Sequence, residues 1–311
     1  MVSTEATSAP APGPGVESPP TAGTVVDVRV VQVSYGDQEP VAERVARVAD
    51  LVRAQRGADL VVLPELWAHG GFAFPTWSER AETMDGPTVS ALSAAARDAG
   101  AIVHAGSFIE RLAPGEAGAA APAGRGMWNT SVVFGPDGGI RAAYRKVHRF
   151  GFGEGEPLLL DAGEEVVTTP LLDREGRQVA SMGVATCYDL RFPEMFRALL
   201  DAGSDVFVVP AAWPAARVGH WELLGQARAL ENQSFMVQCN TGGSHSGVPM
   251  GGSSQVVGPD GVVLARAGRG EEVLSVTIDL EQVRSYRSSF PVLDDRRLRD
   301  AARPAAWDAP A

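Results

Sequence analysis

The chain has 311 residues, of which 45% are hydrophobic and 21% are charged, a composition typical of a globular protein with a sizeable core. Its 38 Asp and Glu residues outnumber its 27 Lys and Arg residues, and the net charge of -11 argues against nucleic acids or anionic membrane surfaces as partners. Two cysteines cannot form a disulfide framework and favour a reducing, cytoplasmic location. No apolar run approaches the ~20 residues of a transmembrane helix.

The first residues of the chain differ in composition from the rest. Residues 1–23 consist mainly of Ala, Pro, Ser, Thr and Gly and contain no Lys or Arg. A secretory signal peptide needs a positive start and an apolar middle, so we expect a disordered tail here instead. Residues 24–311 contain no obvious linker and are expected to form a single domain.

The first half of this domain alternates between β-branched runs and amphipathic stretches. Val41, Val45, Val48 and Val52 recur at spacings of three and four, which predicts a helix with one apolar face. The same reasoning predicts strands over 25–33, 59–66 and 102–110, helices over 41–55 and 87–100, and a flexible surface loop over 112–126.

The second half repeats this rhythm. It predicts strands over 177–187, 205–213 and 234–241 and helices over 192–203 and 220–232, an alternation that indicates a layered α/β architecture. Residues 130–146 and 253–268 each contain Gly-Pro-Asp-Gly between two strand-like runs, and each predicts a hairpin. Since each hairpin follows its own run of strands and helices, we expect two similar halves packed around one core.

Cys187 is the first candidate for a chemical role. It lies at a predicted strand-to-helix junction, where α/β proteins place their sites and where backbone N–H groups converge. Local context leaves two readings open, because a free cysteine is most often a buried and inert core residue. Cys239, inside the strand-like run FMVQC, fits that second reading well.

Glu65 and Lys146 are the other two candidates. Glu65 follows a strongly apolar strand in LVVLPEL, where a carboxylate at the rim of the core can act as a general base or as a structural acid. Lys146 follows the second strand of the first hairpin, and the local pattern leaves the face on which it lies ambiguous.

Three separated motifs that contain these residues resemble the nitrilase superfamily of carbon–nitrogen hydrolases. They are LVVLPELW around Glu65, YRKVHRFGFGEGE around Lys146 and GVATCYDLRFPEMFR around Cys187; HWELLGQARALENQSFMVQCN and MGGSSQVVGPDGVVL are also similar. The resemblance runs from about Val25 to Arg297. It implies an α/β fold, a four-layer αββα sandwich, which assembles as a homodimer or a higher homo-oligomer.

The resemblance also implies a catalytic triad of Glu65, Lys146 and Cys187, joined by an accessory glutamate. Two residues of the GFGEGE segment could be that glutamate, and the register favours Glu156 over Glu154. Glu65 would accept the proton of the thiol and Lys146 would stabilise the oxyanion, with the backbone N–H of Tyr188 as the second donor. Glu156 would orient Lys146 or polarise the leaving group. No metal or cofactor is needed for this chemistry.

Further residues of the motifs have two interpretations each. Arg191 and Glu194 are expected to form a structural pair, or Arg191 binds a carboxylate of the substrate. Trp213 either walls the substrate pocket or packs in the core. The remaining polar residues, His148, Glu231 and Asn232, are expected to be loop or scaffold residues.

The amidase branches of the superfamily, ω-amidase and deaminated glutathione amidase, are the most similar. The resemblance therefore implies hydrolysis of a small aliphatic mono-amide of a carboxylic acid to the acid and ammonia. GFGEGE stands where those branches have a longer acidic and proline-containing stretch, so a carbamoyl amide or a nitrile stays an alternative substrate. Of the other function classes, a Cys–His–acid hydrolase and a metal hydrolase lack their motifs, and a partner-binding pseudo-enzyme is disfavoured by the complete triad.

Overall fold

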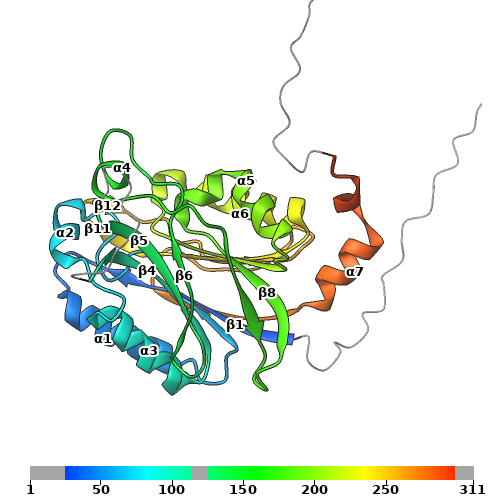
Figure 1. Cartoon of the computed structure of the whole chain (residues 1–311), viewed down its shortest axis with the longest axis horizontal. Helices are drawn as coiled ribbons and strands as arrows, with labels where there is room; N and C mark the ends of the chain where they lie inside the picture. Colours follow the sequence, from blue (N-terminus) through cyan, green and yellow to red (C-terminus); the bar gives the residue numbers. More distant parts are fainter. Residues whose placement is uncertain (1–24, 114–124, 298–311) are drawn as a thin grey trace, which may run out of the picture.

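Two six-stranded sheets packed face to face form the centre of the molecule, which a computed structural model describes over residues 25–113 and 125–297 (Figure 1). The predicted tail 1–23 and most of the predicted loop 112–126 lie outside the described residues. The prediction of a single domain over 24–311 stays a prediction.

The first sheet has the strand order β15-β1-β3-β4-β5-β6. The strands β1, β3 and β4 run parallel, the hairpin β5–β6 extends the sheet from β4, and β15 pairs antiparallel with β1 at the other edge. Their bounds are β1 Val25–Gln32, β3 Leu60–Val62, β4 Ile102–Arg111, β5 Met127–Phe134, β6 Ile140–Arg145 and β15 Glu272–Asp279.

The second sheet, with the order β14-β13-β10-β9-β8-β7, repeats this topology. Three parallel strands, β8, β9 and β10, are again extended by a hairpin, β13–β14, and β7 is the antiparallel edge strand beside β8. The bounds are β7 Val167–Leu172, β8 Gln178–Val184, β9 Val206–Ala211, β10 Phe235–Asn240, β13 Gln255–Val257 and β14 Val263–Arg266. The two similar halves expected from the paired hairpins are therefore present in the topology.

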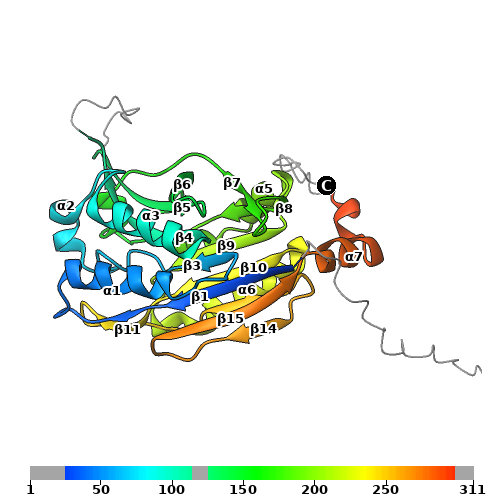
Figure 2. The same cartoon turned by 90° about the horizontal axis from the view of Figure 1, so that it is seen from below.

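Helices cover the outer face of each sheet (Figure 2). Helices α1 Val41–Arg53 and α3 Pro87–Ala99 lie on the first sheet, where Val48 and Val52 of α1 pack with Val61 of β3. Helices α5 Pro193–Asp201 and α6 Val218–Asn232 lie on the second sheet. The layers are thus helix, sheet, sheet and helix, and the predicted αββα sandwich is confirmed.

Smaller elements complete the described chain. A third, small sheet lies at one end of the sandwich and has the strand order β12-β11-β2. Its strands are β2 Ser34–Tyr35, β11 Gly242–His245 and β12 Val248–Pro249. The short helices are α2 Trp77–Arg80, α4 Glu156–Leu159 and α7 Glu281–Ser289, and 3-10 turns lie at η1 Phe74–Thr76, η2 Cys187–Arg191, η3 Ala215–Arg217 and η4 Val292–Asp295. No helix of the described segments is long and apolar enough to cross a membrane.

Burial on both faces explains why the central strands are almost wholly apolar. Every residue of β9, with the sequence VFVVPA, is buried, because one face packs against the other sheet and the opposite face against a helix. Phe207 of β9 lies on the helix side, in edge-to-face contact with Phe196 of α5 at a ring-centroid distance of 5.4 Å.

Several strands end earlier than predicted, and two of them carry triad candidates beyond their ends. The strand predicted over 59–66 ends at Val62, and the strand predicted over 177–187 ends at Val184. In each case the chain then turns sharply, with Leu66 and Cys187 both at a φ of 47°. Periodicity does not mark these ends because apolar residues continue past each strand, with Leu63 after β3 and Ala185 after β8.

Replacement of Phe207 tests the packing of the second sheet against its helices. Because the ring is fully buried, we expect Phe207→Ala to lower the free energy of unfolding by about 3–5 kcal/mol in urea denaturation. Phe152→Ala is the matched control, since Phe152 is 83% exposed and its loss should leave the unfolding free energy within about 0.5 kcal/mol. Equal destabilisation by the two changes would contradict this account of the core.

Candidate active site

The three triad candidates come from three different strand ends and meet at one end of the sandwich. Glu65 follows β3, Lys146 follows β6 directly, and Cys187 follows β8 in the second sheet. The Lys146 ammonium donates a hydrogen bond to Glu65 Oε1 at 2.8 Å. Cys187 lies close enough to exchange a hydrogen bond with Glu65 and to interact electrostatically with Lys146.

The turn that holds Glu65 depends on a glycine in the neighbouring strand. Gly106 lies at an irregularity of β4 and has a φ of 69°. A Cβ atom at this position would lie 1.8 Å from the carbonyl oxygen of Pro64, so only glycine permits this approach. Ser107 then accepts the backbone N–H of Leu66 at 3.1 Å, which fixes the chain on the far side of Glu65.

Lys146 lies between two buried carboxyl groups. Its Nζ is 3.0 Å from Glu156 Oε2, in addition to the contact with Glu65. Asn129 of β5 donates from its Nδ2 to both glutamates, at 2.8 Å to Glu65 and 2.7 Å to Glu156. Glu65 also accepts the backbone N–H of Ala212 at 2.8 Å, so both of its oxygens are held.

The charges of this cluster constrain one another. Glu156 and Glu65 hold the pKa of Lys146 well above its ordinary value although burial opposes the charge, so the side chain stays an ammonium. Burial and the nearby charge of Glu65 raise the pKa of Glu156. The cluster is therefore a cation shared by two carboxyl groups that do not ionise independently.

Cys187 combines backbone strain with a protonated thiol. It is 8% exposed, and its φ of 47° is a conformation that non-glycine residues adopt rarely and mainly at functional sites. Burial and the charge of Glu65 raise the pKa of the thiol well above its ordinary value, and the opposing effect of Lys146 is smaller. At neutral pH the sulfur is thus a thiol that needs a base at the moment of attack, and Glu65 is within reach.

Asp189, which the sequence analysis did not identify, holds the turn of Cys187 against the strand of Lys146. Its fully buried carboxylate accepts the N–H of Thr186 at 2.8 Å and the hydroxyl of Tyr144 at 2.7 Å. It also accepts the backbone N–H of His148 at 3.0 Å and contacts His148 Nδ1 at 2.7 Å. One carboxylate therefore ties the residue before Cys187 to both sides of Lys146.

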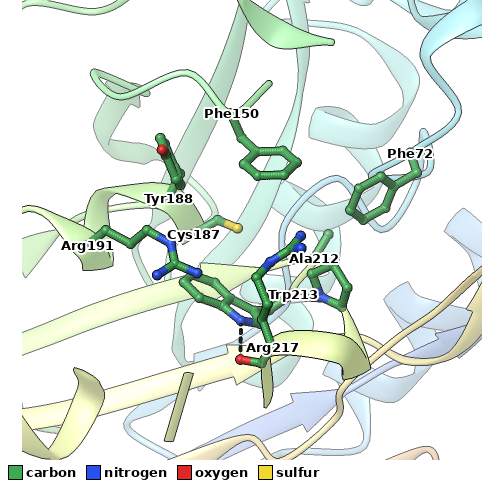
Figure 3. A pocket seen from close by; sticks show the side chains of 9 residues that line it. Phe72, Phe150, Cys187, Tyr188, Arg191, Ala212, Trp213 and Arg217 are labelled. Atoms are coloured by element: carbon green, nitrogen blue, oxygen red, sulfur yellow. Dashed lines mark hydrogen bonds between the residues drawn. The ribbon is translucent and has the colours of Figure 1, made fainter. Parts of the chain in front are cut away.

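A small cavity opens over the sulfur of Cys187 (Figure 3). Four aromatic side chains line it, and two arginines, Arg191 and Arg217, contribute the charged part of its wall. The aromatic residues are Phe72, Phe150, Tyr188 and Trp213. Trp213 is held by its ring N–H, which donates to the carbonyl of Arg217 at 2.8 Å. The cavity is narrow and suits a small substrate.

The expected pair between Arg191 and Glu194 is wrong. Glu194 is exposed, and among the described residues no ion pair joins the two side chains. The guanidinium of Arg191 instead lies 4.7 Å from the ring centroid of Trp213, with Nη2 3.4 Å from His220 Nδ1. The pair was expected at the start of the helix, but Arg191 precedes α5 and its side chain turns toward the cavity.

The other candidate residues lie in the cavity wall, beside Lys146 or within the scaffold of α6. Tyr188 and Trp213 line the cavity, and Glu156 is buried beside Lys146 whereas Glu154 is exposed. Glu231 and Asn232 bond to Arg228 within α6, as expected of scaffold residues. The residues that sequence reasoning missed are Phe72, Asn129, Phe150, Asp189 and Arg217. Phe150 and Asp189 lie inside motifs that it had singled out as catalytic.

Within residues 25–113 and 125–297, no group of three or more His, Cys, Asp or Glu side chains is arranged to hold a metal ion.

Substitution of Asp189 tests its part in holding the Cys187 turn. Asparagine offers one acceptor oxygen, and its amide would point donors at N–H groups, so we expect Asp189→Asn to lower the free energy of unfolding by about 1–3 kcal/mol. The loosened turn should also let iodoacetamide alkylate Cys187 faster. Asp173→Asn, in a turn distant from the site between β7 and β8, is the control and should alkylate like the wild type. Identical alkylation in both variants would show that Asp189 does not hold the thiol.

Comparison with known proteins places this geometry in a family. The model of the carbon-nitrogen hydrolase family matches residues 27–288. The chain is 47% identical to a 2-oxoglutaramate amidase of Paenarthrobacter nicotinovorans over 88% of this chain and 90% of that protein, and 34% identical to a 2-oxoglutaramate amidase of Bacillus subtilis over 85% and 94%.

Two solved structures agree with this placement in the family. A CN-hydrolase superfamily protein from Xanthomonas campestris, which carries an arsenic adduct in its active site, is 30% identical with a TM-score of 0.76, over 88% of this chain and 97% of that chain. Saccharomyces cerevisiae Nit3, a member of the nitrilase superfamily, is 29% identical with a TM-score of 0.74, over 88% of this chain and 97% of that chain. The chain therefore belongs to the carbon–nitrogen hydrolase family, and it is an amidase of that family.

Proposed function

We propose that this amidase hydrolyses the terminal amide of a small ω-amide with a free carboxylate, 2-oxoglutaramate being the leading candidate, through a thioester on Cys187. The observation that carries the proposal is the cavity over Cys187: its wall contains two arginines, and Cys187 itself interacts with the Glu65–Lys146 pair. The similarity to 2-oxoglutaramate amidases supports the choice of substrate.

The first half of the reaction forms the thioester. Glu65 accepts the thiol proton while the sulfur of Cys187 attacks the amide carbon, and the carbonyl oxygen becomes an oxyanion. The Lys146 ammonium and the backbone N–H of Tyr188 donate to this oxyanion, and one such donor is worth about 3–4 kcal/mol of the barrier. The protonated Glu65 then transfers its proton to the nitrogen, the C–N bond breaks and ammonia leaves.

The second half of the reaction hydrolyses the thioester. Glu65, now a carboxylate again, accepts a proton from water as the oxygen attacks the thioester carbon. The C–S bond breaks, the thiolate recovers the proton from Glu65, and the acid leaves. Glu156 contacts Lys146 and is held by Asn129, which supports a role in orienting the ammonium; polarisation of the leaving group stays the alternative.

Arg191, in the wall of the cavity, supports a substrate with a carboxylate. The cavity wall contains no Asp or Glu side chain, and Arg191 is stacked on Trp213, so its guanidinium is already oriented. The net charge of the chain opposes anions at long range, but salt screens such interactions beyond ~8 Å. The local cation therefore decides which end of the substrate lies away from Cys187.

A homodimer is part of the proposal. Leu223 and Leu230 are exposed two turns apart on the same face of α6, at 65% and 48% of their surface. Val262 and Leu264 of the β13–β14 hairpin add further exposed apolar surface. Exposed apolar surface of this kind favours pairing with a second copy.

The cytoplasmic location stays a prediction from the two unpaired cysteines.

Ammonia release tests the nucleophile. Cys187→Ala should abolish ammonia release from 2-oxoglutaramate and glutaramate, because no other group in the cavity can form the thioester. Cys239→Ala is the matched control, because the thiol of Cys239 is buried and contacts the carbonyls of Val31 and Val62. We expect this variant to retain its activity. A panel with N-carbamoyl amino acids and nitriles decides between the substrate classes. Near wild-type turnover by Cys187→Ala would refute the mechanism.

The carboxylate anchor has its own test. Wild-type protein should prefer glutaramate over its methyl ester, and Arg191→Ala should lose this preference mainly through a higher KM. Arg284→Ala, an exposed arginine on α7, should keep it. Should wild type hydrolyse the acid and the ester equally, no carboxylate is bound, although the amidase mechanism would stand.

A further inference from the structure

Arg217 is a second cation of the cavity, and it differs from Arg191 in its surroundings. It is the last residue of η3, and its guanidinium lies 5.7 Å from the ring centroid of Phe150. Figure 3 shows Arg191 on the Tyr188 side of the cavity and Arg217 on the Phe72 side, with the sulfur of Cys187 between them in this view. The loop is held by the bond from Trp213 to the carbonyl of Arg217.

The charge of Arg217 has no carboxylate to balance it. Across residues 25–113 and 125–297, no ion pair or side-chain hydrogen bond of its guanidinium is present, and the cavity wall contains no acidic side chain. A half-buried guanidinium keeps five donors and loses part of its hydration. A ligand that supplies acceptor oxygens at this point would satisfy it.

A substrate carboxylate bound at Arg191 supplies acceptor oxygens to that guanidinium alone. The guanidinium of Arg217 then needs a second acceptor group on the substrate. A 2-oxo acid offers a carboxylate and an adjacent carbonyl oxygen, which are two acceptor groups on neighbouring carbons. An amino acid amide such as glutamine carries an ammonium on that same carbon, where a cation would repel it. A simple ω-amide such as glutaramate carries only hydrogens there.

We propose that Arg217 is a specificity-determining residue, which binds the 2-oxo oxygen of a 2-oxo-ω-amide and excludes amides with an α-ammonium group. This inference rests on the proposed function, because it takes the carboxylate to lie at Arg191 and the amide at Cys187. It adds the reason why a cavity with two arginines and no acidic side chain distinguishes a 2-oxo acid from the amino acid of the same length.

The test compares kcat and KM for 2-oxoglutaramate, glutaramate and glutamine. Wild type should rank them in that order in kcat/KM. Arg217→Gln should lower the ratio of 2-oxoglutaramate to glutaramate about tenfold, mostly through KM, since a charged hydrogen bond is lost. Arg217→Gln should also reduce the difference in kcat/KM between glutaramate and glutamine. Arg217→Lys keeps the charge and should still exclude glutamine while losing part of the 2-oxo preference.

The control variant is Arg284→Gln on the surface of α7, which should leave both ratios unchanged. An unchanged 2-oxoglutaramate to glutaramate ratio in Arg217→Gln would overturn the inference. An equal loss on all three substrates would also overturn it, because Arg217 would then support the cavity as a whole.

Binding without turnover separates this inference from the proposed function. In the Cys187→Ala background, calorimetry gives the dissociation constants of 2-oxoglutaramate and glutaramate, both with Arg217 retained and with the added change Arg217→Gln. A preference for 2-oxoglutaramate that disappears with Arg217→Gln supports the inference even if wild type releases no ammonia, whereas a preference that persists refutes it. Absence of ammonia release by wild type would refute the proposed function alone.

Discussion

The buried ammonium of Lys146 is the constraint on which the rest of the site depends. A lone charge at this depth would cost several kcal/mol, and the protein offsets this cost with two carboxyl groups, which the amide of Asn129 holds in place. These partners leave Lys146 charged and immobile before any substrate arrives. Such a preorganised donor stabilises an oxyanion without having to reorient, which is the property that the proposed mechanism requires.

The duplicated topology explains how this cluster meets its nucleophile. The first sheet supplies Glu65 and Lys146 from the ends of β3 and β6, and the second sheet supplies Cys187 from the end of β8. Hydrogen bonds at the site cross between the halves: Ala212 after β9 donates to Glu65, and Asp189 accepts from Tyr144 of β6 and from the backbone N–H of His148. The site is therefore as rigid as the face-to-face packing of the two sheets, and neither half contains it alone.

Much of this was predictable from local patterns, and the missing parts share one cause. The parallel strands and their helices follow valine-rich runs and apolar spacing, whereas β7 and β15, with the sequences VTTPLL and EVLSVTID, are half-buried edge strands with weak patterns. The triad was identified because its motifs resemble a family. Asn129 and Arg217 could not be found in this way, since their importance comes from neighbours more than 25 residues distant in the chain or from the wall of a cavity.

The protonated state of Cys187 also bears on how the protein withstands oxidants. Peroxides and electrophiles react with thiolates, so a buried sulfur whose pKa is raised well above the ordinary value is a poor target while the cavity is empty. Its nucleophilicity arises only when a carbonyl carbon lies beside it and Glu65 can accept the proton. We therefore expect slow formation of sulfenic and sulfinic acid at rest, and more selective inactivation by compounds that present a polarised carbonyl than by general alkylating agents.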